Sequence, residues 1–548
     1  MKTNALLRVT ALFAAALLFA SCTFDAPESL RDSGIHFHLP EMTPPTTTKV
    51  DLKQDGLDIK LNWQVGDVIN LLTVDSESEK TTLDYTVTAL NPDGTIKTYT
   101  LSDAFPEGTF DLYGVYGGRG IFDEDKRLAI MPLPEKAATS WLQKLAENKA
   151  FMLAFERKGI TQEELAGGLD ISLQHIGSLF NIKLKNTGAS PLNKVTHARL
   201  VSSTPMPAFE FGNTYNLVDK QFVGAKTTTL TFLPVSSSNI VPGGILEFWG
   251  WIPMEKNAEW PALTLEVISS GPDLTSTNSK AARTATVGKV YYLFATYDGT
   301  SLQFVPEGQE EATMTVEAGK LADFRDGNLY NTVQIGEQIW MKENLKFLPS
   351  VVSSATLSTW EPLYYVNCYI NTDVAEAKDF KDYDVYIYNT YGVLYNWPAA
   401  MAGATSSNDN PSGVQGVCPP GWHLPSETEW QQLETHLGML TVELEKEDIW
   451  ERGVDEGKKL KEPEAGGHWT PDPIHEGTNA SGFTALPAGY MGTGSTGFYG
   501  LFNYAGFWSA TAYDGWDTWT RMLSYNKSTV FRMHQSYASG FSVRCVKD

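Results

Sequence analysis

Short segments in which apolar and polar residues alternate recur from about residue 35 to residue 305. Clear examples are residues 67–73, 82–90 and 95–101 in the first part of this stretch, and residues 194–201, 227–233 and 262–268 in the second part. Turn-forming residues such as Asn91-Pro92-Asp93-Gly94 separate neighbouring segments at the spacing of β-hairpins. Because alternation with a period of two places apolar side chains on one face, these segments are predicted to be half-buried strands.

The predicted strands form two consecutive blocks. Residues 141–155 interrupt them with a pattern that predicts a helix or a long connection, and ISLQHIGSLFNIKLK (171–185) opens the second block. A mostly β protein is therefore predicted, with one β-sandwich subdomain over residues 33–165 and another over residues 166–305. Residues 306–325 begin with a polar, acidic run that carries Pro306 and Gly308, which predicts a linker or the end of the second subdomain.

The pattern changes again after residue 325. Residues 330–334 and 338–341, joined across Ile335-Gly336-Glu337, predict a hairpin. Further on, Ser426 can cap a helix whose capping box closes with Glu429, and Trp430, Leu433 and Leu437 then fall on one face. The sequence therefore predicts strands and a helix together in this part, and helix capping explains the acidic residues Glu427 and Glu429 without catalysis.

The first residues predict export from the cytoplasm. Lys2 and Arg8 precede an apolar run over residues 9–20, which is shorter than the about 20 residues that cross a bilayer and fits a signal peptide. The junction Leu18-Phe19-Ala20-Ser21-Cys22 resembles a bacterial lipobox, which implies removal of residues 1–21 and lipidation of Cys22. The alternative is an ordinary signal peptide cut near Ser21. Residues 22–32 are then predicted to be a tether between the lipid anchor and the first subdomain.

Composition narrows the class of protein. A chain of 548 residues is too long for one core, so about two to four domains are expected. The net charge of −23 and the lack of a basic stripe disfavour nucleic acid as a partner. If Cys22 is lipidated, Cys368, Cys418 and Cys545 remain, and one disulfide with one free thiol is the simplest arrangement.

Three short motifs in the β blocks resemble fimbrillin-like lipoproteins of Bacteroidota. They are WQVGDVI (63–69), HIGSLFNI (175–182) and VGKVYYL (287–293), in the order that this family shows. In these motifs Trp63 and Tyr291 are interpreted as core residues. The alternative is a generic secreted β-sandwich protein.

The fimbrillin resemblance implies assembly by strand exchange. An N-terminal strand, here within residues 35–49, would be cleaved away so that the groove accepts a strand from a neighbouring subunit by β-augmentation. Arg31 and Lys49 are the candidate processing sites, and the sequence does not choose between them. The implied partners are other fimbrial subunits, and the implied location is the outer membrane, with the chain anchored by lipid and exposed on the cell surface.

The C-terminal part resembles the Fibrobacter succinogenes major paralogous domain. The resemblance rests on DGNLY (326–330), IGEQIWMKENL (335–345), YGVLYNW (391–397), CPPGWHLP (418–425) and FSVRC (541–545). It implies an α+β, C-type-lectin-like domain over residues 326–548 and a disulfide between Cys418 and Cys545. Cys368 lies in the apolar run YYVNCYI (364–370) and is predicted to be a buried free thiol.

An acidic, aromatic loop is the best candidate for ligand binding. Tyr513, Trp516 and Trp519 offer flat faces to a sugar ring or a protein side chain, and Asp514 and Asp517 offer acceptors. The alternative is an aromatic strand pair that fills the core, which is how Trp508 is interpreted. EPE (462–464) and WDT (516–518) depart from the calcium-binding motifs of C-type lectins, so no metal, calcium dependence or cofactor is predicted.

Three hypotheses from different classes follow. The first is a fimbrial tip adhesin that binds a glycan or a host or bacterial surface protein; a C-terminus occupied by a whole domain is poorly placed to donate a strand, which favours a tip position. The second is a surface lipoprotein that captures ligands without polymerising. The third is an enzyme similar to the formylglycine-generating family, which needs a neighbouring pair of reactive cysteines. No such pair and no HExxH or GxSxG motif is present, so no catalytic residue is predicted.

Overall fold

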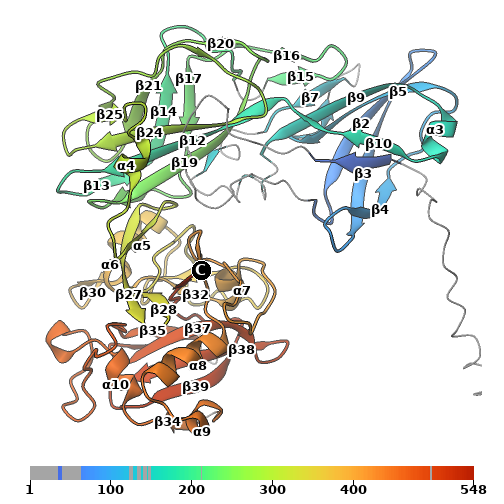
Figure 1. Ribbon diagram of the computed structural model, residues 1–548. Helices are drawn as coiled ribbons and strands as arrows, with labels where there is room; N and C mark the ends of the chain where they lie inside the picture. Colours follow the sequence, from blue (N-terminus) through green and yellow to red (C-terminus); the bar gives the residue numbers. More distant parts are fainter. Residues whose placement is uncertain are drawn as a thin grey trace, which may run out of the picture.

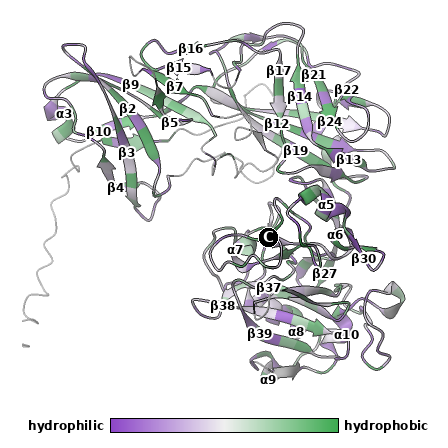
Figure 2. Ribbon diagram, turned by 180° about the vertical axis from the view of Figure 1, so that it is seen from behind, coloured by the Kyte–Doolittle hydropathy of each residue, from purple (hydrophilic) through white to green (hydrophobic). Residues whose placement is uncertain are grey.

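The computed structural model describes residues 35–39, 63–122, 127–132, 138–139, 145, 148, 150–210, 213–447, 449–493 and 497–548. The described chain is mostly β, as the alternating patterns predict. Figure 1 shows two β units side by side and the C-terminal domain below the second unit. In Figure 2, hydrophobic and hydrophilic residues are mixed along the strands of both β units. Among the described residues, no helix combines the length and the apolar character that crossing a bilayer requires.

The first β unit is built on a six-stranded sheet with the order β11-β9-β5-β2-β3-β4. Its strands are β2 (Val68–Asp75), β3 (Lys80–Leu90), β4 (Ile96–Leu101), β5 (Phe110–Gly117), β9 (Met152–Ile160) and β11 (Gln174–His175). Alternate residues such as Ile69, Leu83 and Val115 are buried, and Trp63 lies in the same core, as predicted. Beside this sheet, β1 (Ile35–His38) pairs in parallel with β10 (Leu169–Ser172). The short helix α3 (Gln162–Ala166) begins at a capping box formed by Thr161 and Glu164.

The second β unit places two sheets around one core. The first sheet has the order β25-β24-β12-β19-β8 and the second has the order β17-β14-β21-β22. The bounds are β8 (Ala138–Thr139), β12 (Gly177–Asn186), β14 (His197–Val201), β17 (Thr229–Phe232), β19 (Ile245–Pro253), β21 (Thr264–Ile268), β22 (Leu274–Thr275), β24 (Val290–Tyr297) and β25 (Leu302–Phe304). Tyr291 is buried, as predicted. A side chain at Gly177 would meet the carbonyl oxygen of Ile252 at 2.5 Å, so this close pairing of β12 with β19 requires glycine.

Short strands of each β unit pair with strands of the other. The predicted boundary between subdomains at residues 165 and 166 did not include this pairing. β7 (Leu128–Ile130) pairs with β6 (Ile121–Phe122) and with β15 (Thr214–Asn216), which in turn pairs with β16 (Gln221–Val223). β8 pairs with β19. Two further small pairs are β13 (Leu192–Val195) with β18 (Ser238–Ile240), and β20 (Glu259–Trp260) with β23 (Arg283–Thr284). The core around Ile69 accordingly includes Trp249 and Trp251 of the second unit.

Two segments were predicted to be connections. The helix or long connection predicted over residues 141–155 is wrong at its end, because β9 begins at Met152. The predicted linker, residues 306–325, contains helix α4 (Glu310–Met314) and strand β26 (Lys320–Asp323). Met314 packs against Ile245 and Phe294 of the second β unit, which fits the alternative that this segment is the end of the second subdomain.

The C-terminal domain contains two sheets. Their orders are β26-β27-β28-β40-β33 and β34-β39-β38-β37-β35-β36. The strands are β27 (Asn328–Ile335), β28 (Gln338–Met341), β33 (Trp422–His423), β34 (Ile449–Arg452), β35 (Ala488–Gly492), β36 (Gly497–Leu501), β37 (Tyr504–Ala512), β38 (Asp517–Ser524), β39 (Val530–Ser536) and β40 (Val546–Lys547). Small pairs join β29 (Tyr364–Tyr365) to β32 (Leu394–Tyr395) and β30 (Lys381–Asp382) to β31 (Val385–Tyr386).

Helices cover parts of these sheets. They are α5 (Val374–Asp379), α6 (Ile387–Tyr391), α7 (Trp397–Met401), α8 (Glu427–His436), α9 (Thr441–Leu444), α10 (Glu456–Leu460) and a 3-10 turn at Glu464–Gly466. The predicted hairpin is confirmed, with Ile335 opposite Gln338 and Gly336 at a φ of 62°. The predicted capping box of Ser426 and Glu429 is confirmed too, and Trp430, Leu433 and Leu437 are buried.

Candidate functional site

The predicted binding loop joins β37 to β38 and exposes two of its three aromatic side chains. Trp516 is 59% exposed and Tyr513 is 45% exposed. Asp514 holds the turn, because its Oδ1 accepts hydrogen bonds from the backbone N–H groups of Trp516 and Asp517, each at 2.7 Å. These bonds lower the pKa of the Asp514 carboxyl. The loop therefore presents Trp516 from a turn that its own side chains fix.

A second exposed indole stands beside Trp516. Trp360 is 71% exposed, and its ring centroid lies 5.6 Å from that of Trp516 in an edge-to-face arrangement. Ser358 positions Trp360, since its Oγ accepts from the backbone N–H groups of Trp360 and Glu361 at 3.1 and 2.8 Å. We call Trp360, Trp516 and Tyr513 the aromatic surface.

Trp360 is not among the ligand-binding residues predicted from the sequence. The signal available was an aromatic residue in the polar segment Ser358-Thr359-Trp360-Glu361-Pro362, where no apolar period explains it. Because Trp360 and Trp516 are far apart along the chain, only the fold brings them together.

Trp519 does not belong to the aromatic surface, which corrects its assignment as a ligand-binding candidate. It is 7% exposed, and the guanidinium of Arg532 covers its ring at 3.8 Å from the centroid. It lies inside β38, where every residue from Thr518 to Ser524 is buried. The ring of Trp519 contacts the ring of Tyr513 edge to face, with their centroids 4.9 Å apart.

Asp517 is engaged with a neighbouring strand. Its Oδ2 lies 2.8 Å from Nδ1 of His534, and the His534 ring stacks on Tyr513 with a centroid distance of 4.3 Å. The predicted five residues therefore divide into two exposed rings, two carboxylates that hold the loop and its flank, and one buried indole.

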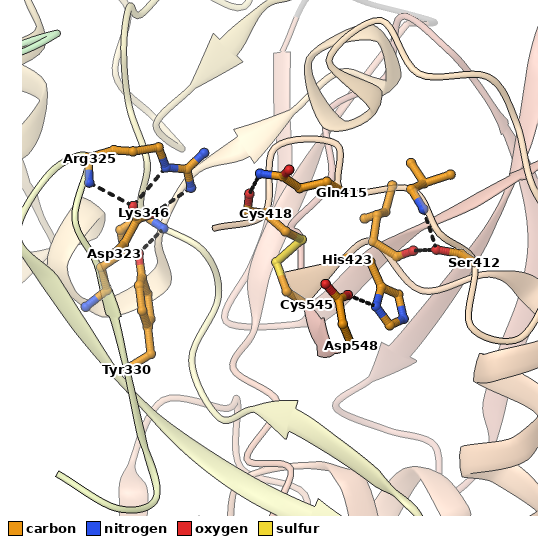
Figure 3. The surroundings of a disulfide bond; sticks show 12 residues. Asp323, Arg325, Tyr330, Lys346, Ser412, Gln415, Cys418, His423, Cys545 and Asp548 are labelled. Atoms are coloured by element: carbon orange, nitrogen blue, oxygen red, sulfur yellow. Dashed lines mark hydrogen bonds and ion pairs between the residues drawn. A yellow bond between two sulfur atoms is a disulfide. The ribbon is translucent and has the colours of Figure 1, made fainter. Parts of the chain in front are cut away.

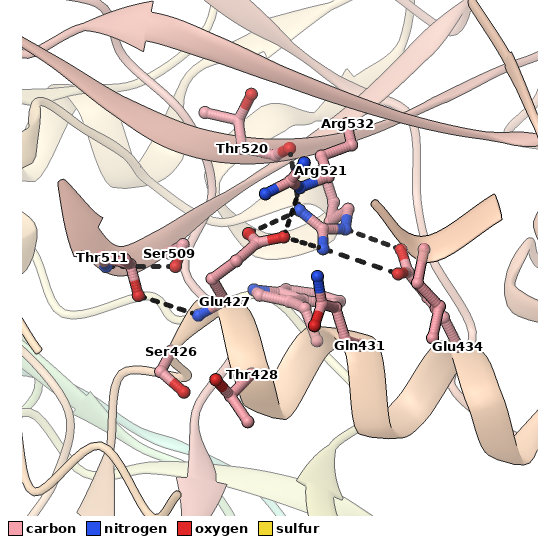
Figure 4. Close-up of polar contacts among 12 residues, drawn as sticks. Ser426, Glu427, Thr428, Gln431, Glu434, Ser509, Thr511, Thr520, Arg521 and Arg532 are labelled. Carbon is pink, nitrogen blue, oxygen red and sulfur yellow. Dashed lines mark hydrogen bonds and ion pairs between the residues drawn. The ribbon is translucent and has the colours of Figure 1, made fainter. Parts of the chain in front are cut away.

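A buried ion network lies under the sheet that carries the loop (Figure 4). Glu427 of α8 binds Arg521 through two hydrogen bonds of 2.6 and 2.8 Å and also binds Arg532 at 2.5 Å. Glu434, two turns along the same helix, binds Arg521 at 2.6 Å and also Arg452. All five side chains are buried. Because each carboxylate binds two guanidiniums, the network fixes α8 against β34, β38 and β39.

The Cys418–Cys545 disulfide implied by the family resemblance is present in the structure, with its Cα atoms 6.0 Å apart (Figure 3). Close to it, buried His423 contacts Asp548 through Nδ1 at 2.6 Å and Glu429 through Nε2 at 2.7 Å. Burial opposes protonation of this ring, but the two carboxylates outweigh burial and raise the pKa of His423. These contacts tie β33 and β40 to the start of α8.

The described residues do not offer the reactive cysteine pair that the enzyme hypothesis needs. The disulfide occupies Cys418 and Cys545, and Cys368 is the one free cysteine in the described part of the chain. Partial burial and the neighbouring Asp382 raise the pKa of Cys368 to about 11, so its thiol is protonated at neutral pH. No group of three or more His, Cys, Asp or Glu side chains with the spacing of a metal site occurs in the described ranges. Cys22, Arg31 and Lys49 lie outside the described residues.

Most of the C-terminal domain matches a known family of domains. Residues 333–547 match the Fibrobacter succinogenes major domain. The matched residues include the disulfide, the buried ion network and the aromatic surface. No curated protein matches the chain in sequence.

Solved structures give weaker likenesses. One is described as a "putative cell adhesion protein" from Bacteroides ovatus, with 14% identity, a TM-score of 0.30, and coverage of 50% of this chain and 95% of that chain. A second with the same description, from Bacteroides fragilis, has 11% identity, a TM-score of 0.31, and coverage of 50% and 97%. The tip fimbrial protein Mfa3 from Porphyromonas gingivalis has 11% identity, a TM-score of 0.26, and coverage of 44% and 92%.

Proposed function

We propose that the chain is a surface-exposed fimbrial subunit that joins its neighbours by strand exchange and binds a glycan or a surface protein through its C-terminal domain. A lipid anchor at Cys22 and cleavage at Arg31 or Lys49 belong to this proposal. The partners proposed for assembly are other fimbrial subunits. A tip position is also part of the proposal, and it is supported by the pairing of β40 with both β28 and β33, which leaves this strand with no open edge.

The observation that carries the proposal is the position of β1 in a two-stranded sheet of its own. β1 pairs with a single neighbour, β10, from Ile35 opposite Leu169 to His38 opposite Ser172. Ile35 and Phe37 are buried, whereas His36 and His38 are less so. The alternation gives a strand that binds through one row of backbone hydrogen bonds and two apolar side chains.

The contacts of these two side chains define a slot in the first β unit. Tyr85 donates from its hydroxyl to the carbonyl oxygen of Ile35 at 3.1 Å. The ring of Phe37 lies 4.9 Å from that of Tyr85 and 5.2 Å from that of Phe155. Burial of two such side chains stabilises the pairing by about 3–6 kcal/mol in total. A strand from another subunit with apolar residues at the same two positions satisfies the same groups.

The slot is tested with a protein that lacks residues 1–39 and a peptide of residues 33–42. We expect the peptide to raise the free energy of unfolding of the truncated protein by about 2.7 kcal/mol at 100 times its dissociation constant. The matched control is the same peptide with Phe37→Asp, which cannot bury its side chain beside Tyr85. Thermal unfolding followed by tryptophan fluorescence measures both. Equal stabilisation by the two peptides, or a truncated protein that stays unfolded with either, contradicts strand exchange and favours a surface lipoprotein that does not polymerise.

The ligand-binding half of the proposal rests on the aromatic surface. Two indoles that are more than half exposed and in contact with each other form an apolar face on an otherwise acidic protein. Such faces stack on sugar rings or on protein side chains. Asp514 accepts hydrogen bonds from the loop backbone, and Asp517 contacts His534. The proposal therefore assigns ligand contact to the aromatic rings.

Replacing Trp516 by Ala in the full-length chain is expected to weaken ligand binding roughly tenfold, because an aromatic contact contributes about 1.4 kcal/mol. A glycan array followed by titration of the bound glycan measures the effect. Trp360→Ala is expected to act in the same direction. Tyr386→Ala removes a partly exposed aromatic ring on β31 of the same domain and is the control. Binding that survives both tryptophan changes would place the ligand elsewhere.

A further inference from the structure

A small polar cavity lies where the second β unit meets the C-terminal domain. Its volume is about 230 Å³. Asn193 and Asn239 line it from the second β unit, and Asp326, Lys378 and Tyr388 line it from the C-terminal domain. Asn193 is exposed, whereas Asp326 and Tyr388 are buried, so the cavity runs from an exposed rim to a buried polar floor. We call it the junction cavity.

Asp326 carries a carboxylate oxygen that the described part of the protein leaves unsatisfied. The residue is 4% exposed. Its Oδ1 accepts from the backbone N–H of Asn328 at 3.0 Å, but its Oδ2 is buried without a hydrogen-bond partner among the described residues. The neighbouring Arg325 is engaged by Asp323, at 2.6 and 2.8 Å. A buried acceptor without a partner costs about 1–3 kcal/mol, and more when it is charged, so this oxygen calls for a donor from outside the chain.

Two hydrogen-bond donors line the same cavity. Lys378 uses two of its three N–H groups, on Ser236 Oγ at 3.2 Å and on the carbonyl oxygen of Ser237 at 2.9 Å. The hydroxyl of Tyr388 accepts from Asn328 at 3.2 Å and still carries its own proton to donate. Burial raises the pKa of Asp326 to about 7, with Asp323 adding to the rise and Lys378 opposing it. One acidic and one basic group face the same space, so the cavity favours a neutral occupant over an ion.

We propose that the junction cavity binds a small neutral polyhydroxy compound of monosaccharide size or smaller. One ligand hydroxyl donates to Asp326 Oδ2, and others accept from Lys378 and Tyr388. A hydroxyl group can both donate and accept a hydrogen bond. It therefore suits a cavity wall that carries an acceptor on Asp326 and donors on Lys378 and Tyr388. At about 30 Å³ for each water, the volume equals roughly eight waters, which a compound of this size displaces. The site is separate from the aromatic surface and goes beyond the proposed function.

A ligand in this place bridges two parts of the chain. Residues from the second β unit and from the C-terminal domain both line the cavity, so occupancy adds contacts across the junction. Binding to the folded chain alone raises the thermal midpoint with ligand concentration. The consequence is a sugar-dependent rise in stability that requires the intact, full-length protein.

The test uses the full-length chain with glycerol, ribose, glucose, galactose and mannose in thermal unfolding and isothermal titration calorimetry. At least one of these compounds is expected to raise the thermal midpoint and to bind saturably. Asp326→Asn replaces the accepting oxygen by an N–H₂ group in one amide orientation and is expected to weaken binding at least tenfold. Tyr388→Phe, which removes only a hydroxyl, is expected to act in the same direction and serves if the Asp326 variant does not fold. Trp516→Ala is expected to leave this binding unchanged.

Three other outcomes would overturn the inference. No saturable binding by any of the five compounds means that the cavity holds water only. Equal binding by wild type and both cavity variants, with loss in Trp516→Ala, assigns the sugar to the aromatic surface and leaves the proposed function intact. Stabilisation by calcium or sodium chloride in place of sugars, lost in Asp326→Asn, assigns a cation to Asp326.

Discussion

Replacing Glu427 by Gln is expected to lower the free energy of unfolding of the C-terminal domain by about 3–5 kcal/mol, because it breaks a buried ion network on one side. Glu427 and Glu434 face Arg452, Arg521 and Arg532 in the folded protein. The change keeps the volume of the side chain but leaves three buried guanidiniums with one carboxylate. Urea unfolding followed by tryptophan fluorescence measures the loss.

Two further variants separate this charge effect from a general effect of mutation. Arg532→Gln removes a cation from the same network and leaves two carboxylates with two guanidiniums, so it is expected to cost less than Glu427→Gln. Glu445→Gln changes an exposed glutamate between α9 and β34 and is expected to stay within about 0.5 kcal/mol of wild type. If Glu427→Gln behaves like Glu445→Gln, the network does not stabilise the domain as described.

The effect of Glu427→Gln depends on pH with a definite sign. Burial alone would raise the pKa of Glu427, but Arg521 and Arg532 outweigh burial and lower it. A lowered folded-state pKa contributes stability that is fully present above the unfolded pKa of about 4.3 and is lost as pH falls through the folded-state value. The gap between wild type and Glu427→Gln is therefore expected to be constant from about pH 6 to pH 8 and to narrow below about pH 4.

Removing the disulfide with Cys418→Ala and Cys545→Ala together is expected to lower the free energy of unfolding by about 2–5 kcal/mol. The bond closes a segment with a sequence separation of 127 residues, so the unfolded chain loses much of its freedom when the bond is present. Both sulfurs are buried, and the bond joins chain beside β33 to chain beside β40. Urea unfolding of the double variant, compared with wild type in the oxidised and reduced states, measures the contribution.

Cys368→Ala is the control for the disulfide. Cys368 is the free cysteine of the same domain and donates a weak hydrogen bond to Asn367 at 3.1 Å. This variant is expected to retain the full response to a reductant. Wild-type protein that unfolds at the same urea concentration with and without reductant would show that the crosslink adds nothing measurable.

The features that the sequence predicted are those with local physical causes. Alternation predicted the strands β2, β3 and β14, and the spacing of Ser426 and Glu429 predicted the start of α8. The disulfide followed from a family resemblance because the spacing of cysteines alone does not fix a pairing. These elements depend on periodicity, capping or a motif, each contained in a short stretch of chain.

The features that the sequence did not predict depend on partners far apart in the chain. β1 pairs with a strand more than a hundred residues later, and Trp360 meets Trp516 only after folding. Glu427 has the pattern of a first-turn acid, and nothing in its neighbourhood reveals that Arg521 and Arg532 neutralise it. Trp516 and Trp519 lie in the same acidic, aromatic stretch of sequence. Only the structure shows that Trp516 precedes β38 and is exposed, whereas Trp519 lies within β38 and is buried.

The docked segment between the second β unit and the C-terminal domain has a consequence for avidity. Lys185 donates to the carbonyl oxygens of Thr313 and Thr315, each at 2.8 Å, and the backbone N–H of Glu247 donates to Phe324 at 2.7 Å. These contacts oppose rotation of the C-terminal domain relative to the second β unit. Each copy of the chain then presents its two indoles in a fixed orientation relative to its own β units, so attachment of several copies to a multivalent target costs less rotational entropy for each copy.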